Sequence, residues 1–286
     1  MWGRLSAAAI VLLALAVIPA VATSKGSNTE LAWLQPANIY HSGLRGTHTI
    51  ALTFDDGPNG YTPAVLDALQ ALDVKATFFI VGRMAHAHPD ILARIADEGH
   101  LLANHSATHP LLDQRYADNP GLLLDQLRDV DDQITPLMAA DAKFYFRAPY
   151  GAWRHEFADT LNDDPVLNKY VGPIYWDVGG QTAFSDDGYV LSSADWDCWH
   201  RGWDAQTCAK GYIREIRRKN GGVVILHCIH AQSGALVAAL VPPLIEEGYD
   251  FVRLDEVPDY RKYETAPQES EPSVASLDRQ RVAAAR

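Results

Sequence analysis

The chain has 286 residues, a net charge of −12 and an isoelectric point near 5.3. Hydrophobic residues make up 48% of it and charged residues 21%, which is enough apolar material for one large packed domain or two small ones. The acidic balance argues against a nucleic-acid-binding protein and against general adhesion to anionic lipid.

The N-terminus has the layout of a secretory signal peptide over residues 1–22. Arg4 precedes an apolar run, Ala7–Ile18, and the small triplet Ala20–Ala22 follows. We expect cleavage after this triplet and a secreted or periplasmic protein. The alternative is an uncleaved membrane anchor, because the uncharged stretch is just long enough to span a bilayer.

The rest of the chain divides into three parts by composition. Residues 23–46 are polar and poorly periodic, which predicts a linker or cover. Residues 47–258 carry the regular apolar patterns of a single domain. Residues 259–286 end in a stretch rich in small, charged and proline residues, which predicts a disordered tail.

Within the domain, short apolar runs alternate with helical patterns. This alternation predicts βα units and an α/β fold with a mainly parallel sheet, and about seven parallel strands in one run favour a closed barrel. The predicted strands are Thr49–Phe54, Ala76–Val81, Leu101–Asn104, Phe144–Arg147, Ile174–Val178, Val223–His227 and Phe251–Leu254.

Three cysteines occur in the chain. In an oxidising compartment, Cys198 and Cys208 can close a short loop as a disulfide. Cys228 lies beside a predicted buried strand, so we expect a lone, packed thiol. The spacing between these cysteines argues against a structural zinc site.

Polar side chains follow several of the predicted strands. The carboxyl ends of parallel strands meet at one edge of a sheet, and functional groups collect there in parallel α/β folds. The groups placed at this edge are Asp55 and Asp56, His105 and His109, Arg147 and Tyr150, and His227.

The two histidines after the third strand are candidate metal ligands. His105 and His109 are four residues apart, so on a helical turn both imidazoles would point the same way. Two histidines alone would favour a coincidental surface pair. Addition of Asp56 completes a set that leaves coordination positions open, as catalytic sites for zinc and similar divalent ions do.

The adjacent carboxylates of Asp55 and Asp56 can then have different roles, Asp56 as a metal ligand and Asp55 as a base. If Asp56 binds a cation, Asp55 can stay ionised beside it and take a proton from water whose pKa the metal lowers towards ~7. A turn or a helix cap is the alternative explanation, but one aspartate would suffice for either.

Three further residues have candidate roles in hydrolysis. His227 can protonate the leaving group, with His230 as a competing candidate and a packed core histidine as the alternative. Arg147 can hold Asp55 ionised, or it can form an ordinary ion pair. The backbone N–H near Tyr150 can stabilise an oxyanion, or the segment can be a plain turn.

Four segments resemble the ordered motifs of the polysaccharide deacetylases, which form carbohydrate esterase family 4, the chitooligosaccharide deacetylase homology domain. The resemblance spans about Thr47 to Val257. The segments are TFDDGP at Thr53–Pro58, HSATH at His105–His109, RAPYG at Arg147–Gly151 and ILH at Ile225–His227.

The resemblance implies a distorted (β/α) barrel and a role for each matched residue. Zinc is the implied metal, with cobalt, nickel or iron as substitutes. The implied roles are catalytic base for Asp55, metal ligand for Asp56, His105 and His109, orientation of the base for Arg147, oxyanion binding for the Tyr150 N–H, and general acid for His227.

The implied reaction is removal of N-acetyl groups from N-acetylglucosamine units in chitin-like polymers or peptidoglycan. A carbohydrate polymer or oligomer is therefore the expected partner, and we expect a monomer with no membrane contact beyond the export signal. An O-acetyl esterase acting on xylan and an inactive sugar-binding module of the same fold are the alternatives. Loss of the base or of the metal ligands would mark an inactive module, and both sets are present.

One motif departs from the family pattern. The family places an aspartate followed by tryptophan shortly after the fifth strand, and this aspartate partners the acid histidine. Here an insertion intervenes, and Asp195 with Trp196 resembles its displaced end. Asp177 on the strand, or Asp186 and Asp187 in the loop, are rivals for the same role. We interpret the insertion as a rim loop that stacks on sugar rings through Trp196, Trp199 and Trp203.

Overall fold

The computed structural model describes residues 42–261. The predicted signal peptide, most of the predicted linker and nearly all of the predicted tail lie outside this range. Within it, no helix has both the length and the apolar character needed to cross a membrane.

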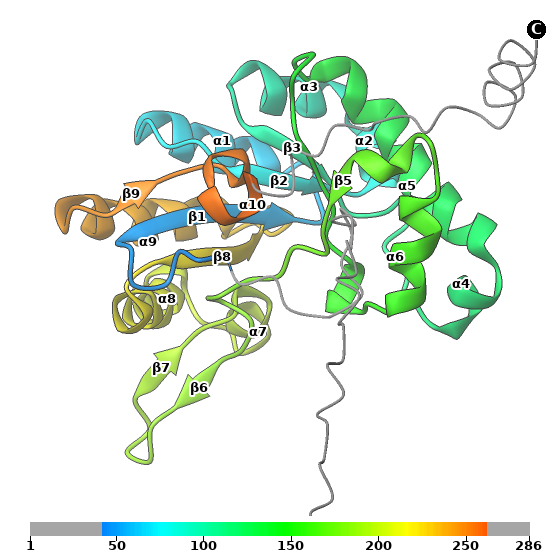
Figure 1. The fold of residues 1–286 in the computed structure, drawn as a ribbon. Coiled ribbons are helices and arrows are strands. Elements are labelled where there is room, and N and C mark those ends of the chain that lie inside the picture. The colour runs from blue at the N-terminus through cyan, green and yellow to red at the C-terminus, as the bar shows by residue number, and fades with distance from the viewer. Residues whose placement is uncertain (1–41, 262–286) are drawn as a thin grey trace, which may run out of the picture. The chain divides into compact units, whose positions relative to one another are not determined.

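A parallel sheet forms the centre of the fold (Figure 1). Its strand order is β3-β2-β1-β8, and β9 pairs with the start of β1. β4 and β5 form a second, two-stranded parallel ladder. The strands are β1 (Thr49–Asp55), β2 (Thr77–Ile80), β3 (Leu101–Asn104), β4 (Phe144–Tyr145), β5 (Tyr170–Val171), β6 (Ala183–Phe184), β7 (Val190–Ser192), β8 (Gly222–His227) and β9 (Asp250–Phe251).

Helices cover the outer face of this sheet (Figure 1). The helices of the described chain are α1 (Thr62–Ala71), α2 (Gly82–Ala87), α3 (Pro89–Asp97), α4 (Gln114–Asp118), α5 (Pro120–Ile134), α6 (His155–Asn162), α7 (Asp195–His200), α8 (Ala205–Lys219), α9 (Ser233–Glu246) and α10 (Pro258–Arg261). Residues of α1, α2, α3, α5, α7, α8 and α9 pack in the core cluster on the outer face, whereas Tyr260 of α10 packs in the cluster on the other face.

Strand β1 shows how the two faces of the sheet divide. Successive side chains of a strand point to opposite faces. Ile50, Leu52 and Phe54 pack in the core cluster that includes residues of α1, α8 and α9. Ala51 packs in a second cluster on the other face. Asp55 lies four residues further along the same strand, so its side chain points to the same face as that of Ala51. The candidate base therefore lies on the inner face of the sheet, at the end of the strand.

The α/β class and the parallel sheet are confirmed. Within residues 42–261 the strands do not form one continuous, closed ladder. At two places neighbouring segments are joined by a single β-bridge and not by a run of paired residues. One bridge joins Asn104 to Phe146, and another joins Val178 to Val224.

The predicted strand Ile174–Val178 is wrong as a regular strand. The Ile174 N–H donates to the carbonyl of Phe146, whereas the N–H groups of Asp177 and Val178 donate to the carbonyl of Val223. The segment thus bonds to two different neighbours, and no repeating ladder forms along it.

The insertion after this segment forms an antiparallel hairpin, β6–β7, that extends away from the sheet (Figure 1). Its chain returns into α7, which a disulfide between Cys198 and Cys208 ties to α8. The predicted pairing of these cysteines is present, and Cys228 is a free, buried thiol.

The N-terminal end of the described chain packs onto the body. Ser42 and Leu44 are buried. The Ser42 hydroxyl donates to the carboxylate of Asp177 at 2.6 Å, and Arg45 Nε donates to the same carboxylate at 2.6 Å. Residues 42–45 of the predicted linker therefore contact the domain.

Candidate active site and metal centre

The candidate residues meet because their strands are parallel and in register. Asp55 pairs directly with His227 across β1 and β8. The Arg147 N–H donates to the carbonyl of Asn104, which places Arg147 beside the residue that follows β3. A cavity of about 480 Å³ opens between these strand ends; it is lined by Asp55, Asp56, His105, His109, Ala148, Tyr150, Gly151, Trp176, Gly179, Gly180, Trp196, Ile225 and His227.

The segment that carries the two histidines is a loop, so the predicted helical turn is wrong. Asn104 Oδ1 accepts from the Ser106 N–H at 2.9 Å, and the Ser106 hydroxyl accepts from the His109 N–H at 3.1 Å. These side chains replace the helical backbone bonds, and both Ser106 and His109 have positive φ.

Backbone strain concentrates at this site. Non-glycine residues at positive φ are uncommon, and they cluster where a function requires an unusual conformation. Four of the seven such residues in the described chain lie here: Asp56 (φ 72°), Ser106 (φ 70°), His109 (φ 57°) and Tyr150 (φ 59°).

Asp56, His105 and His109 form a cluster that can hold a metal ion. One ligand atom from each lies within 4.8 Å of the other two. Asp56 Oδ1 is 3.5 Å from His105 Nε2 and 3.2 Å from His109 Nε2. Asp56 Oδ1 is buried and has no hydrogen-bond donor. A buried acceptor without a donor is costly, and a cation between these three atoms would satisfy it.

The protonation of the cluster also suits a cation. His105 Nδ1 lies 2.8 Å from the carbonyl of Arg147, which can only accept, so the proton is on Nδ1 and the lone pair of Nε2 is free. Burial lowers the pKa of His109, which favours its neutral form. Burial alone would raise the pKa of Asp56, but the neighbouring imidazoles outweigh this effect and lower that pKa well below its usual range.

Asp55 is held by Arg147 beside this cluster. Both side chains are almost completely buried. Arg147 Nη1 donates to Asp55 Oδ1 at 2.6 Å and to the Thr53 hydroxyl at 2.9 Å. The guanidinium also lies over the ring of Phe79, 4.0 Å from its centroid. Asp55 Oδ2 faces the cluster, 3.6 Å from His105 Nε2.

His227 is paired with Asp195. The Asp195 carboxylate accepts from the His227 backbone N–H at 2.7 Å and from its Nδ1–H at 2.8 Å. Burial would lower the pKa of His227, but attraction and hydrogen bonding from Asp195, with further attraction from Asp56 and Asp55, raise it to about 10.

The rival aspartates have other contacts. Asp177 accepts from Ser42, Arg45 and the Val223 N–H. Asp187 accepts from the Ser185 hydroxyl, and Asp186 is exposed in the turn of the hairpin. The structure therefore places only Asp195 of the four against His227.

The competing acid His230 is half-buried and is not among the residues that line the cavity. Burial lowers its pKa, which disfavours the protonated form that a proton donor needs. His227 has both the better position and the better protonation state.

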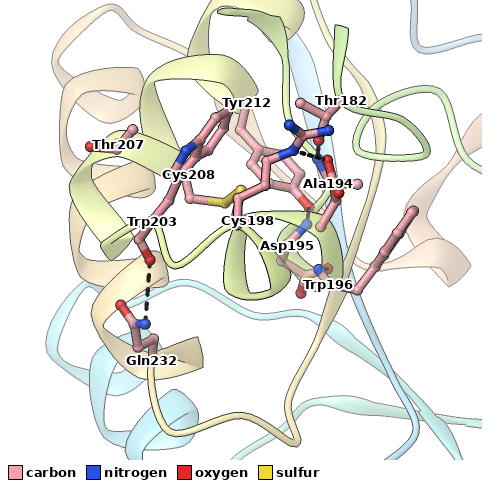
Figure 2. Close-up of a disulfide and its surroundings, with 12 residues drawn as sticks. Thr182, Ala194, Asp195, Trp196, Cys198, Trp203, Thr207, Cys208, Tyr212 and Gln232 are labelled. Atoms are coloured by element: carbon pink, nitrogen blue, oxygen red, sulfur yellow. Dashed lines mark hydrogen bonds and ion pairs between the residues drawn. A yellow bond between two sulfur atoms is a disulfide. The ribbon is translucent and has the colours of Figure 1, made fainter.

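Two exposed aromatic side chains flank the cavity. Tyr150 is 69% exposed, and its ring packs edge-on against the imidazole of His109 with the two ring centroids 4.6 Å apart. Trp196 is 53% exposed and points away from the disulfide (Figure 2). Trp199 and Trp203 are partly buried against the core and are not among the residues that line the cavity, so stacking of these two on sugar rings stays a prediction.

Trp176, Gly179 and Gly180 line the cavity and were not predicted as site residues. A Cβ at Gly180 would lie 2.2 Å from Trp176 Nε1, so any other residue there would displace the indole. The signal was the Gly-Gly pair that directly follows the expected fifth strand, because adjacent glycines indicate a close backbone approach.

The fold and the site together define a parallel α/β protein with a candidate metal centre at the carboxyl ends of its strands. Residues 43–166 match the family model described as polysaccharide deacetylase. The chain is therefore a relative of the polysaccharide deacetylases, and the resemblance of its motifs to that family is confirmed.

Curated proteins and a solved structure show the same similarity. The chain is 28% identical over 227 residues to the peptidoglycan-N-acetylmuramic acid deacetylase PdaA of Bacillus subtilis, covering 78% of this chain and 76% of that protein. It is 38% identical over 179 residues to a peptidoglycan-N-acetylglucosamine deacetylase of Bacillus cereus, covering 54% of this chain and 64% of that protein. It is 36% identical over 133 residues to a chitooligosaccharide deacetylase of Bradyrhizobium, covering 46% and 59%. The structure of Bacillus subtilis PdaA, described as a family 4 carbohydrate esterase, aligns with a TM-score of 0.59 and 27% identity over 77% of this chain and 84% of that chain.

Proposed function

We propose that this protein is a metal-dependent hydrolase that removes N-acetyl groups from N-acetylglucosamine-containing polysaccharide, such as a chitin-like polymer or peptidoglycan. The observation that carries the proposal is the convergence of three groups in one cavity: the metal-ligand cluster, the Asp55–Arg147 pair and the Asp195–His227 pair. The similarity to peptidoglycan and chitooligosaccharide deacetylases supports polysaccharide deacetylation.

Asp56, His105 and His109 would hold the metal. A ligand set of two imidazoles and one carboxylate suits zinc first, with cobalt, nickel or iron as alternatives. When bound, a divalent ion supplies Lewis acidity and lowers the pKa of water.

Asp55 would act as the base. Arg147 occupies its Oδ1, which leaves Oδ2 to accept a proton from the attacking water as the oxygen of that water bonds to the acetyl carbonyl carbon. Both side chains of the Asp55–Arg147 ion pair are buried, so the adjacent guanidinium offsets the cost of burying the carboxylate.

His227 would act as the acid. Its Nδ1–H is held by Asp195, so the proton on Nε2 is the one available to the amine nitrogen as the carbon–nitrogen bond breaks. The products are acetate and a free sugar amine, and the proton taken by Asp55 balances the proton given by His227.

The exposed residues at the cavity supply contacts to the substrate. We assign the Tyr150 backbone N–H to the developing oxyanion, in the turn Pro149–Gly151. We assign Trp196 to stacking on a sugar ring, since its indole is exposed at the cavity. The expected setting is the periplasm or the outside of the cell, and the expected state is a monomer.

Acetate release tests this proposal. The purified protein is incubated with chitooligosaccharides, peptidoglycan and acetylxylan, each with and without a chelator. We expect release from one or both of the first two, abolished by chelator and restored by added zinc. Release that a chelator leaves unchanged would contradict metal dependence, and release from acetylxylan alone would contradict N-deacetylation.

The variant Asp55→Asn is the matched control for this assay. It removes the base and keeps the side-chain shape, so it should bind metal normally and release no acetate. A near-normal rate in this variant would show that Asp55 is not the base.

A further inference from the structure

Helix α8 carries a line of side chains that hold both ends of the inserted hairpin segment. Cys208, Tyr212, Glu215 and Lys219 are spaced four, three and four residues apart, so they lie on one face of the helix. Cys208 forms the disulfide to α7, and Figure 2 shows Tyr212 on the same helix near Asp195.

Tyr212 joins the start of α7 to strand β8. Its side chain is fully buried. The Tyr212 hydroxyl accepts from the Asp195 backbone N–H at 2.8 Å and donates to the carbonyl of Ile225 at 3.2 Å. Ile225 lies two residues before His227 on the same strand.

The other end of the insertion is held by the same helix. The Gly179 N–H donates to Glu215 Oε2 at 3.2 Å, and Lys219 Nζ donates to Glu215 at 2.6 Å and to the carbonyl of Asp177. Gly179 has φ +92°, and a Cβ there would lie 2.6 Å from Tyr212 Cε1. Tyr212 therefore packs directly against the cavity wall as well as bonding to Asp195.

We propose that Tyr212 is a positioning residue for the Asp195–His227 pair; the inference rests on the proposed acid role of His227. Asp195 is fixed to β8 at two places, by its backbone through Tyr212 and by its carboxylate through His227. The Tyr212 bond fixes the backbone of Asp195, and the two His227 bonds hold its carboxylate. Without the Tyr212 hydroxyl, the start of α7 could shift while only the carboxylate stays bonded to His227. Outer hydrogen bonds that orient metal-ligating residues are typically worth about 10- to 100-fold in affinity or activity, and we expect an effect at the lower end of that range for this acid pair.

The test is Tyr212→Phe, which keeps the ring and removes only the hydroxyl. We expect kcat to fall about tenfold with KM within about twofold, because substrate contacts are intact while the acid is misaligned. In an Asp195→Asn background the same change should have little further effect, since Tyr212 acts through Asp195. Equal effects in both backgrounds would contradict the proposal.

Tyr249→Phe is the matched control. Tyr249 belongs to the same core cluster, but it precedes β9, which pairs with the start of β1. It is therefore about 20 Å along the strand from the site. This variant should keep kcat, and melting temperatures of both variants show that the assay temperature leaves each one folded.

A second readout does not depend on catalysis. A His227 Nδ1–H bonded to a buried carboxylate should give a downfield proton resonance by NMR. Asp195→Asn should abolish it, Tyr212→Phe should shift or broaden it, and Tyr249→Phe should leave it unchanged. If the wild-type protein releases no acetate, the proposed function fails, while this resonance still tests the positioning. An unchanged resonance in Tyr212→Phe would overturn the proposal.

Discussion

Replacement of Asp195 by asparagine should disable the acid pair without removing any substrate contact. The carboxylate accepts two hydrogen bonds from His227, at 2.7 Å and 2.8 Å, through its two oxygens. Asparagine has nearly the same shape but only one acceptor oxygen, so its amide N–H₂ must face an N–H of His227. The substitution also removes the charge that raises the pKa of His227 to about 10.

The size of the effect follows from that pKa. If it falls to the ordinary value of about 6.5, roughly 3% of His227 is protonated at pH 8, and the rate should drop about thirtyfold there. At pH 6 most of the histidine is protonated again, so much of the rate should return. The alkaline limb of the kcat profile should therefore move to lower pH.

The assay is acetate release between pH 5 and 10 for the wild-type protein, Asp195→Asn and the control Asp197→Asn. Asp197 lies on the same helix and is buried, but its partner is Arg201. The control should keep the wild-type profile. An Asp195→Asn protein with kcat within about threefold of wild type at pH 8 and an unmoved alkaline limb would refute the reasoning.

The same pairing predicts how stability depends on pH in chelator-treated protein. The pKa of His227 is raised on folding from 6.5 to about 10, so the protonated histidine is stabilised by the fold. Its contribution is fully present below about pH 6.5 and is lost as the pH rises through about 10. The difference in unfolding free energy between wild type and Asp195→Asn should shrink over that interval, as measured by urea denaturation. A constant difference would contradict the assignment.

Three further results are expected. His105→Ala should lose bound divalent metal by elemental analysis, and unchanged metal content would remove it from the ligand set. Arg147→Met should lower the unfolding free energy of chelator-treated protein by about 3–5 kcal/mol, because it leaves the buried charge of Asp55 unpaired, and a much smaller loss would indicate that water reaches this carboxylate. Removal of the Cys198–Cys208 disulfide, which closes a separation of 10 residues, should cost about 2.7 kcal/mol on the chain-entropy estimate, and no loss would argue against its formation.

Local pattern predicted the groups that end the strands. Asp55 and Asp56 follow an apolar run, and His227 ends another. Because parallel strands place their carboxyl ends together, the meeting of these residues followed from the fold class alone. The His-x₃-His spacing indicated the cluster, although the conformation expected there was a helix and the structure has a loop.

The partner of the acid histidine was decided only by tertiary structure. The sequence offers four aspartates as candidate partners of His227: Asp177, Asp186, Asp187 and Asp195. The insertion changes the spacing of the family motif, so sequence position does not distinguish between them. In the structure the start of α7 lies beside the end of β8, and there the Asp195 carboxylate accepts both hydrogen bonds from His227.

By itself the sequence determined the strand-end carboxylates and imidazoles and the kind of site they make, because these depend on residue type and on alternation along single strands. Only the tertiary structure decided which aspartate faces His227 and how Tyr212 and Gly179 support it. Those contacts join segments that are far apart in the chain, and each segment taken alone shows only an amphipathic helix, a glycine or a polar turn. The hydrogen bonds from the Asp195 and Gly179 N–H groups to helix α8 form only when that helix packs against the sheet. Tertiary packing sets them, because no local sequence pattern constrains these two backbone groups.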